Sequence, residues 1–341
     1  MDAYWEDKVA RLDRITVPAY VTAGWNTALH SRGSIDGFRG IASAHRWLVA
    51  HREFEWPYFY TPENLEDLRR FFDRYLKGIR NGWELTPRVR IDVMDADDCD
   101  HASKRPEAEF PLARTQYREL FLDAAAKSLS PVPAAEESFV GYEAEAGKAA
   151  FEMTFDQQTE LTGFMKLRLW VQARGAADMD LIVTVQKADA DGDLVPTVSA
   201  AGPHPGVSGM LRASCRELDE DRSAAYQPVY TYRREQLLDD GQVVPLEIAI
   251  DPSSRIWHPG ERLRLVVAGH VEDLTGFGSA SAMDLRSRGE HVIHTGGRFD
   301  SHLLVPVIPS RRPAGHGRSQ EEARTRFVEQ QIGSDQTAVT S

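Results

Sequence analysis

The stretch WLVAHREFEWPYFYTPENLEDLRRFFDRYLKGIRNGWELTPRVRIDV, residues 47–93, decides the fold because the spacing of its apolar residues changes twice. Residues 47–50 are continuously apolar, as in a short strand that is buried on both faces of a parallel sheet. Apolar residues then recur at helical spacing in residues 65–76, after Thr61 as a capping residue. From residue 87 they alternate with polar residues, which is typical of a strand with one exposed face. The sequence therefore predicts an α/β segment that passes into a β-domain.

The chain before this stretch predicts more structure of the α/β type. Residues 20–25 are apolar and β-forming, and residues 31–42 leave room for a crossover helix between two parallel strands. In the helix that follows, one face is expected to collect the apolar residues Leu65, Leu68, Phe71, Phe72, Tyr75 and Leu76. A parallel sheet with so few strands has open edges, so something else is expected to cover them.

The β-domain is predicted from runs in which apolar and polar residues alternate. These runs are residues 89–93, 165–171, 181–185, 244–250, 263–267 and 303–307. Turn signals such as Asp-Gly and Pro-Gly separate them. We expect an all-β sandwich, a jelly roll with Greek-key connections.

Three regions follow from these patterns. Residues 1–86 form the α/β segment, residues 87–310 form the β-sandwich, and residues 311–341 form a mobile polar tail.

Composition and charge exclude several classes of protein. The chain has 52 acidic and 40 basic residues, and its net charge of -12 disfavours a nucleic-acid partner. Its two cysteines, Cys99 and Cys215, form no C-x-x-C pair, and the sequence has no signal-peptide pattern and no run of 18 apolar residues. We therefore expect a cytoplasmic protein with no membrane segment, no metal and no cofactor. The acidic run from Asp95 to His101 is interpreted as a solvated loop because it lacks the spacing of a calcium or zinc site.

Several motifs together resemble the CocE/NonD family of serine hydrolases, which includes cocaine esterase and X-Pro dipeptidyl-peptidase. The motifs in the α/β segment are ITVPA at 15–19 leading to GW at 24–25, FFDRYLKG at 71–78 and PRVR at 87–90. The motifs in the β-domain are GMLRAS at 209–214, VPLEI at 244–248 and HPGERLRL at 258–265. Taken together the motifs are specific, whereas none is specific alone.

The resemblance implies an α/β-hydrolase fragment followed by a jelly roll, which in this family forms one side of the active site. In this family the nucleophile lies on a G-x-S-x-G elbow in the N-terminal half, and the 341 residues contain no such motif. The resemblance therefore implies the C-terminal part of such an enzyme, as a truncated gene product or a split-enzyme subunit. It implies a partner, either an N-terminal hydrolase half or a second copy of the chain. The parent reaction is hydrolysis of an ester, an amide or an Xaa-Pro peptide through an acyl-enzyme, and the chain alone is expected to be inactive.

The resemblance also locates the other two members of the catalytic triad. The position of the acid, two residues after Trp25, is Thr27, and the position of the histidine is Glu55. Neither residue type can fill the role that the family gives to its position. A divergent site can instead use His51 or His30 as the base, with Glu53 or Glu55 orienting it. The alternative is that His51 is a turn histidine bonded to a carboxylate and that His30 only precedes a helix.

Aromatic residues near these positions are candidates for substrate binding. We select Trp25, Trp56 and His30, and the alternative is that the aromatic residues pack a domain junction. A second functional hypothesis is a non-catalytic jelly-roll module that binds carbohydrate or a partner protein.

Overall fold

The structure is a computed structural model that describes residues 3–27, 30–96, 99–199, 202–271 and 284–309. The tail predicted at 311–341 lies outside the described residues. The helices are α1 (Ala3–Lys8), α2 (Ser31–Gly40), α3 (Glu55–Phe59) and α4 (Pro62–Leu76), with short 3-10 turns η1 (Leu12–Arg14), η2 (Trp83–Leu85) and η3 (Ala213–Cys215).

The strands of the first half are β1 (Ala19–Gly24), β2 (Arg46–His51), β3 (Val89–Met94), β4 (Asp100–Glu107), β5 (Gln116–Asp123), β6 (Ser128–Ser130), β7 (Ser138–Glu143), β8 (Lys148–Thr154) and β9 (Thr159–Arg174). Those of the second half are β10 (Asp180–Ala188), β11 (Leu194–Val195), β12 (Thr197–Ser199), β13 (Gly202–His204), β14 (Val207–Arg212), β15 (Val244–Trp257), β16 (Arg262–Ala268), β17 (Glu290–Thr295) and β18 (His302–Ile308).

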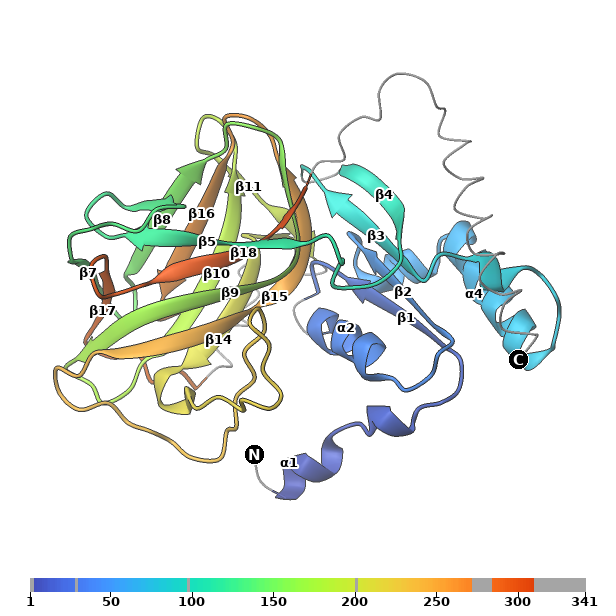
Figure 1. Ribbon diagram of the computed structural model, residues 1–341, viewed down its shortest axis with the longest axis horizontal. Coiled ribbons are helices and arrows are strands. Elements are labelled where there is room, and N and C mark those ends of the chain that lie inside the picture. The colour runs from blue at the N-terminus through green and yellow to red at the C-terminus, as the bar shows by residue number, and fades with distance from the viewer. Residues whose placement is uncertain (1–2, 28–29, 97–98, 200–201, 272–283, 310–341) are drawn as a thin grey trace.

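Three parallel strands form the N-terminal part of the sheet (Figure 1). β1 pairs with β2 along its whole length, and β2 pairs with β3 in the register Leu48 to Val89. Figure 1 shows α2 between these strands and the large β-domain, whereas α4 lies beyond them on the far side. The parallel unit therefore has one helix on each face, as its buried apolar strands require.

Helix α4 differs from its prediction in which residues it buries. Thr61 caps it as expected, because its hydroxyl accepts a hydrogen bond from the Asn64 backbone. Phe71 packs inward in a cluster with Trp47 and Trp83. The exposed apolar residues are Leu65, Phe72 and Leu76, at 48%, 48% and 76% exposure. The prediction of one buried face was wrong for these three residues, because polar Asn64, Asp67 and Asp73 occupy buried positions of the helix.

The rest of the chain is β-structure that closes on itself. Pairing runs in a circuit through β9, β15, β14, β10, β16, β8, β6, β5 and β18, and β18 returns to β9. The circuit encloses a large apolar core that includes Leu167, Val183, Leu246 and Leu265. The chain is therefore predominantly β, with a barrel-like sheet, as Figure 1 shows.

The parallel unit and the barrel share one continuous sheet. β3 lies parallel to the end of β15, where Met94 pairs with Arg255. On the other side of the joint, α2 contacts the loop before β15, because Arg39 donates a hydrogen bond to the Tyr226 hydroxyl at 3.2 Å. These contacts fix the carboxyl ends of β1 and β2 beside the barrel.

The acidic run after β3 is partly a strand instead of a loop. β4 begins at Asp100 and pairs antiparallel with β3, whereas Asp97 and Asp98 lie outside the described residues. Sequence patterns missed β4 because this strand, DHASKRPE, has no alternation of apolar residues. Within the described ranges, no group of three or more His, Cys, Asp or Glu side chains is arranged to hold a metal ion. In the same ranges, no helix has the length and apolar character needed to cross a membrane.

Candidate functional site

The sequence-predicted residues gather at the carboxyl ends of β1 and β2. Gly24 at the end of β1 lies opposite His51 at the end of β2, and the Trp25 backbone donates a hydrogen bond to the His51 carbonyl at 2.7 Å. Ligands of open parallel sheets bind at this edge of the sheet. The remaining candidates follow these strand ends closely: Trp25, Thr27 and His30 come between β1 and α2, and Glu55 and Trp56 begin α3.

Thr27 and His51 converge on the position of Gly24. A Cβ atom at Gly24 would lie 2.8 Å from the Thr27 hydroxyl oxygen, 2.9 Å from the Glu53 carbonyl oxygen and 3.5 Å from His51 Cε1. Thr27 is 5% exposed, and its hydroxyl has no hydrogen-bond partner among the described residues. Glycine is therefore required at position 24 for the two loops to approach each other.

His51 is enclosed. Its side chain has 0% exposure, and its ring stacks on Tyr58 with centroids 3.6 Å apart and planes 5° from parallel. Neither ring nitrogen forms a hydrogen bond of full geometry with a described residue, although the Glu53 backbone is close enough to favour the protonated ring. Burial, together with the nearby positive charge of Lys104, lowers the pKa of His51 to about 4. A neutral, enclosed imidazole packs well, but it is poorly placed to exchange a proton with a substrate.

His30 and Glu55 form a different pair at the same edge. His30 Nδ1 lies 3.0 Å from Glu55 Oε1, and the side chains are 63% and 13% exposed. Glu55 Oε2 is buried without a hydrogen-bond partner among the described residues. A carboxylate held against Nδ1 fixes the tautomer of an imidazole and leaves Nε2 available as a base.

The two residues of this pair come from opposite sides of the site. Glu55 stands at the position where the family resemblance expects a histidine, and His30 lies three residues after Thr27, where it expects the acid. The sequence offered His30 and Glu55 among four possible pairings of a histidine with a glutamate, and the structure brings these two side chains into contact.

The two tryptophans proposed for substrate binding lie in different surroundings. Trp25 is 5% exposed, and its indole nitrogen donates a hydrogen bond to the Asp92 carbonyl at 2.9 Å. Trp56 is 69% exposed and contacts Phe54 edge-on, with ring centroids 5.1 Å apart. The structure brings Trp25 to the wall of a cavity and leaves Trp56 away from that cavity.

This cavity lies between the end of β1 and the barrel. Its volume is about 30 Å³, which is room for ordered water. Trp25, Asn26 and Ser31 line it from the parallel unit, and Asp251 and Trp257 line it from β15. Sequence reasoning missed the barrel residues, although the Asp-Pro step at 251–252 inside an alternating strand was a signal of a bulge.

The charged cluster beside this cavity is internally paired. Lys187 is 1% exposed, and its ammonium group lies 2.9 Å from Asp95 Oδ1 and 2.8 Å from Glu261 Oε2. Arg255 donates hydrogen bonds to the carbonyls of Asp95 and Val195 at 3.3 and 2.9 Å. A buried cation between two carboxylates is satisfied electrostatically, so this cluster joins the barrel to the end of β3.

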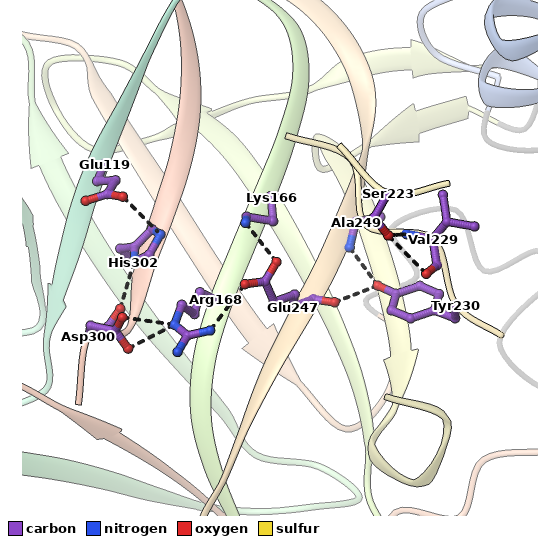
Figure 2. Close-up of polar contacts among 10 residues, drawn as sticks. All are labelled: Glu119, Lys166, Arg168, Ser223, Val229, Tyr230, Glu247, Ala249, Asp300 and His302. Carbon is purple, nitrogen blue, oxygen red and sulfur yellow. Dashed lines mark hydrogen bonds and ion pairs between the residues drawn. The ribbon is translucent and has the colours of Figure 1, made fainter. Parts of the chain in front are cut away.

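A second polar site lies on the outer face of the barrel, where Figure 2 shows a row of charged side chains. Glu247 of β15 accepts from Lys166 at 2.8 Å and from Arg168 at 3.2 Å, and Arg168 also contacts Asp300 at 2.9 Å. The Tyr230 hydroxyl donates a hydrogen bond to the Glu247 carbonyl at 2.7 Å. The row lines a groove with about 930 Å³ of empty space, including the part open to solvent.

Comparisons with known proteins agree with this geometry. Residues 81–304 match the X-Pro dipeptidyl-peptidase C-terminal non-catalytic domain. The cocaine esterase of Rhodococcus sp. (strain MB1 Bresler) is 21% identical over 358 residues, which cover 87% of this chain and 58% of that protein. A CocE/NonD family hydrolase from Staphylococcus aureus is 34% identical with a TM-score of 0.86, covering 90% of this chain and 57% of that one.

The fold alone extends to more distant proteins. An aminopeptidase from a marine sediment archaeon, Thaumarchaeota archaeon, is 14% identical with a TM-score of 0.63, and the match covers 90% of this chain and 58% of that one. A barrel-like β-domain attached to a short parallel sheet is thus the class that the structure defines. The chain belongs to the X-Pro dipeptidyl-peptidase C-terminal domain family and corresponds to the C-terminal portion of the CocE/NonD hydrolases. It spans a little more than half the length of these relatives.

Proposed function

We propose that this chain is the C-terminal part of a serine hydrolase of the cocaine esterase and X-Pro dipeptidyl-peptidase type. The reaction would be hydrolysis of an ester, an amide or an Xaa-Pro peptide through an acyl-enzyme. The observation that carries the proposal is the His30–Glu55 contact of 3.0 Å at the carboxyl edge of the parallel strands. The 341 residues contain no G-x-S-x-G elbow, so the nucleophile has to come from another segment, and this chain should not turn over substrate alone.

In this proposal His30 is the base and Glu55 orients it. The serine of the partner segment attacks the substrate carbonyl while His30 Nε2 accepts the hydroxyl proton. Glu55, bonded to Nδ1, stabilises the imidazolium that forms. His30 then gives the proton to the leaving group, and water cleaves the acyl-enzyme by the same steps in reverse. His51 and Thr27 would hold the two loops together without touching the substrate.

The domain division belongs to the same proposal. Residues 1–86 would be the C-terminal remnant of an α/β-hydrolase domain, residues 87–310 a jelly roll, and residues 311–341 a tail. The parallel order of β1, β2 and β3, with α2 and α4 on opposite faces, supports the first assignment. Among the described strands, β1 pairs with β2 alone, and its free edge suits a strand from the N-terminal hydrolase half or from a second copy.

Labelling with a fluorophosphonate serine-hydrolase probe tests the proposal. The chain alone should remain unlabelled. The N-terminal half of a related hydrolase should be labelled, and its ester turnover should increase when this chain is added. The matched pair of variants is His30→Asn and His45→Asn, since His45 is exposed and lies at the opposite end of β2. His30→Asn should abolish the increase and His45→Asn should preserve it. Labelling of this chain alone, or equal increases with both variants, would contradict the proposal.

The outer groove supports a second candidate function, a non-catalytic binding module. Lys166, Arg168 and Glu247 already neutralise one another, so the groove suits an uncharged, hydroxyl-rich ligand such as an oligosaccharide better than an ion. Calorimetric titration with a panel of oligosaccharides tests this function. Binding that is lost in Glu247→Gln and retained in His30→Asn would favour the module over the hydrolase.

A further inference from the structure

A separate cavity lies at the amino ends of β2 and β3, at the edge of the parallel sheet opposite to the candidate site. Its volume is about 420 Å³, which falls in the range of small-molecule sites. Three arginines from different elements line it: Arg39 from α2, Arg46 from the start of β2 and Arg88 from the residue before β3. The cavity therefore gathers positive charge in a chain whose net charge is -12.

Two of these arginines are held by one short segment of backbone. Arg46 Nη1 donates hydrogen bonds to the carbonyls of Ile41 at 2.8 Å and Ser43 at 3.0 Å. Arg88 Nη1 donates a hydrogen bond to the Ala44 carbonyl at 2.6 Å. All three carbonyls lie between α2 and β2, so the same segment positions both guanidinium groups before any ligand arrives.

Aromatic rings support the same two side chains. The guanidinium carbon of Arg46 lies 5.6 Å from the centre of the Phe38 ring, and that of Arg88 lies 5.0 Å from the centre of the Trp47 ring. Phe38 and Trp47 are buried, at 6% and 1% exposure. A long side chain that rests on a buried ring loses less freedom when it binds a ligand.

The positive charge of the cavity is incompletely balanced. Among the described residues, Arg46 and Arg88 bond to carbonyl oxygens and have no carboxylate partner, and a carbonyl carries no net charge. Arg39 differs because it pairs with Asp36 at 3.2 Å. Glu109 is exposed and also lines the cavity, but it forms no ion pair with any described arginine. Beyond the Arg39–Asp36 pair, two guanidinium groups therefore face one carboxylate.

We propose that this cavity binds an oxoanion, the phosphate or carboxylate group of a small molecule, between Arg46 and Arg88. Each guanidinium has a planar fork of donors, and Nη1 alone of each is bonded to a described residue. The remaining donors match the oxygens of a phosphate or a carboxylate in paired, charge-assisted hydrogen bonds. The buried ring of Phe110 lines the cavity beside them and keeps water from part of its wall.

This ligand is distinct from the substrate of the proposed hydrolase. His30 and Glu55 lie at the carboxyl ends of β1 and β2, whereas Arg46 and Arg88 lie at the amino ends of β2 and β3. An anion bound at the amino ends would not meet the reacting groups. The inference therefore goes beyond the proposed function and does not rest on it.

An NMR titration of the full chain with inorganic phosphate, and separately with acetate, tests the inference. Chloride keeps the ionic strength constant, so that general screening does not change along the titration. The backbone amides of residues 41–46 and of Arg88 should shift and saturate. Tighter binding of phosphate would identify a phosphate-bearing ligand, and tighter binding of acetate would identify a carboxylate.

The variants Arg46→Gln and Arg88→Gln each remove one guanidinium. Each should weaken binding of the tighter anion by about ten-fold or more, the effect expected for charge-assisted hydrogen bonds. The matched control is Arg118→Gln, which removes the same charge from an exposed position on β5 and should change the affinity by less than about two-fold. The variants Arg46→Lys and Arg88→Lys keep the charge but lose the fork, and should also weaken binding by several-fold.

Thermal unfolding of each variant shows whether the fold is kept, and the lysine variants provide the test if a glutamine variant does not fold. Three results would overturn the inference. They are the absence of saturable shifts with both anions, unchanged affinity in the folded variants of Arg46 and Arg88, and an equal loss of affinity in Arg118→Gln. The titration needs no turnover, so its outcome and that of the labelling experiment are independent.

Discussion

His51 and Tyr58 stack face to face, with ring centroids 3.6 Å apart and planes 5° from parallel. This contact closes the end of β2 from inside the molecule, at the position from which an open parallel sheet usually presents functional groups. The histidine that remains accessible is His30, which contacts Glu55 at 3.0 Å and is 63% exposed. His51 is therefore a packed, buried residue, whereas His30 is exposed to solvent.

Acid should destabilise the fold partly through His51. Burial lowers its pKa from 6.5 in the unfolded chain to about 4, so the folded state favours the neutral form. This stability is fully present above pH 6.5 and is lost as the pH falls toward 4. His51→Phe should remove about 2 kcal/mol of the difference in unfolding free energy between pH 7 and pH 4.5.

Urea unfolding at the two pH values measures this difference, and an NMR titration of the imidazole measures the pKa directly. His291, whose pKa burial also lowers to about 4, should keep its share of the pH dependence in the variant. A titration midpoint near 6.5 for His51 would refute the argument.

In the reconstituted hydrolase, Glu55→Gln should lower kcat by about 10²- to 10⁴-fold, with little change in KM, because an amide cannot stabilise the imidazolium of His30. Glu53→Gln serves as the neighbouring control and should keep most of the activity. Steady-state kinetics on a chromogenic ester separates kcat from KM. Equal losses of kcat in Glu55→Gln and Glu53→Gln would contradict the proposal that Glu55 orients His30.

A buried ion pair joins α4 to the sheet. Arg90 of β3 bonds to Asp67 of α4, and its other terminal nitrogen donates a hydrogen bond to the Tyr20 hydroxyl at 2.9 Å. Arg90→Ala leaves a buried carboxylate without its cation, so it should lower the free energy of unfolding by about 3–5 kcal/mol. Chemical denaturation measures the loss.

The control for Arg90 is Arg69→Ala on the exposed side of α4. Arg69 is 60% exposed, and solvent screens its ion pairs, so its loss should change stability much less. The double variant Asp67→Leu with Arg90→Met replaces both charges and should recover much of the lost stability. If Arg90→Ala and Arg69→Ala lowered the free energy of unfolding equally, the buried pair would contribute no more than an exposed one.

Two glycines should respond in opposite directions to alanine. At Gly209, where β14 meets Ile250 of β15, a Cβ would lie 2.1 Å from the Ala249 carbonyl oxygen. Gly209→Ala should destabilise the fold by about 2 kcal/mol or more, because the backbone has to move. At Gly33 in α2 a Cβ meets nothing within 4 Å, so Gly33→Ala should stabilise it by about 0.5–1 kcal/mol. Thermal unfolding of both variants checks the signs, and destabilisation by Gly33→Ala would contradict the helix argument.

Local patterns predicted the long regular elements well. The alternation in residues 165–171 and 244–250 corresponds to parts of β9 and β15, and the helical spacing after Thr61 corresponds to α4. These patterns succeed because each element buries one continuous face. The prediction of which face of α4 is buried was partly wrong because apolar residues occupy two stripes of the helix. The stripe with Phe71 faces the sheet, on the same side as the polar contacts of Asp67.

The candidate site was predictable only in part. Sequence order located the loops after β1 and β2 and named His30, His51, Thr27 and Glu55 as candidates, but it left open which histidine pairs with which acid. That choice depends on the direction of two side chains across loops 25 residues apart. The sequence could not assign Asp251 to the cavity for a similar reason. Asp251 lies more than 200 residues after Trp25 in the sequence, and only the fold brings both residues to the cavity.

The strand β15 has a mechanical consequence for the cavity. It pairs with β9 on both sides of the bulge that carries Asp251, with β14 before the bulge and with β3 after it. β15 therefore links the barrel wall of the cavity to β3 of the parallel unit by strand pairing. Widening the cavity would require this pairing to break, so its small volume should be a fixed property of the fold.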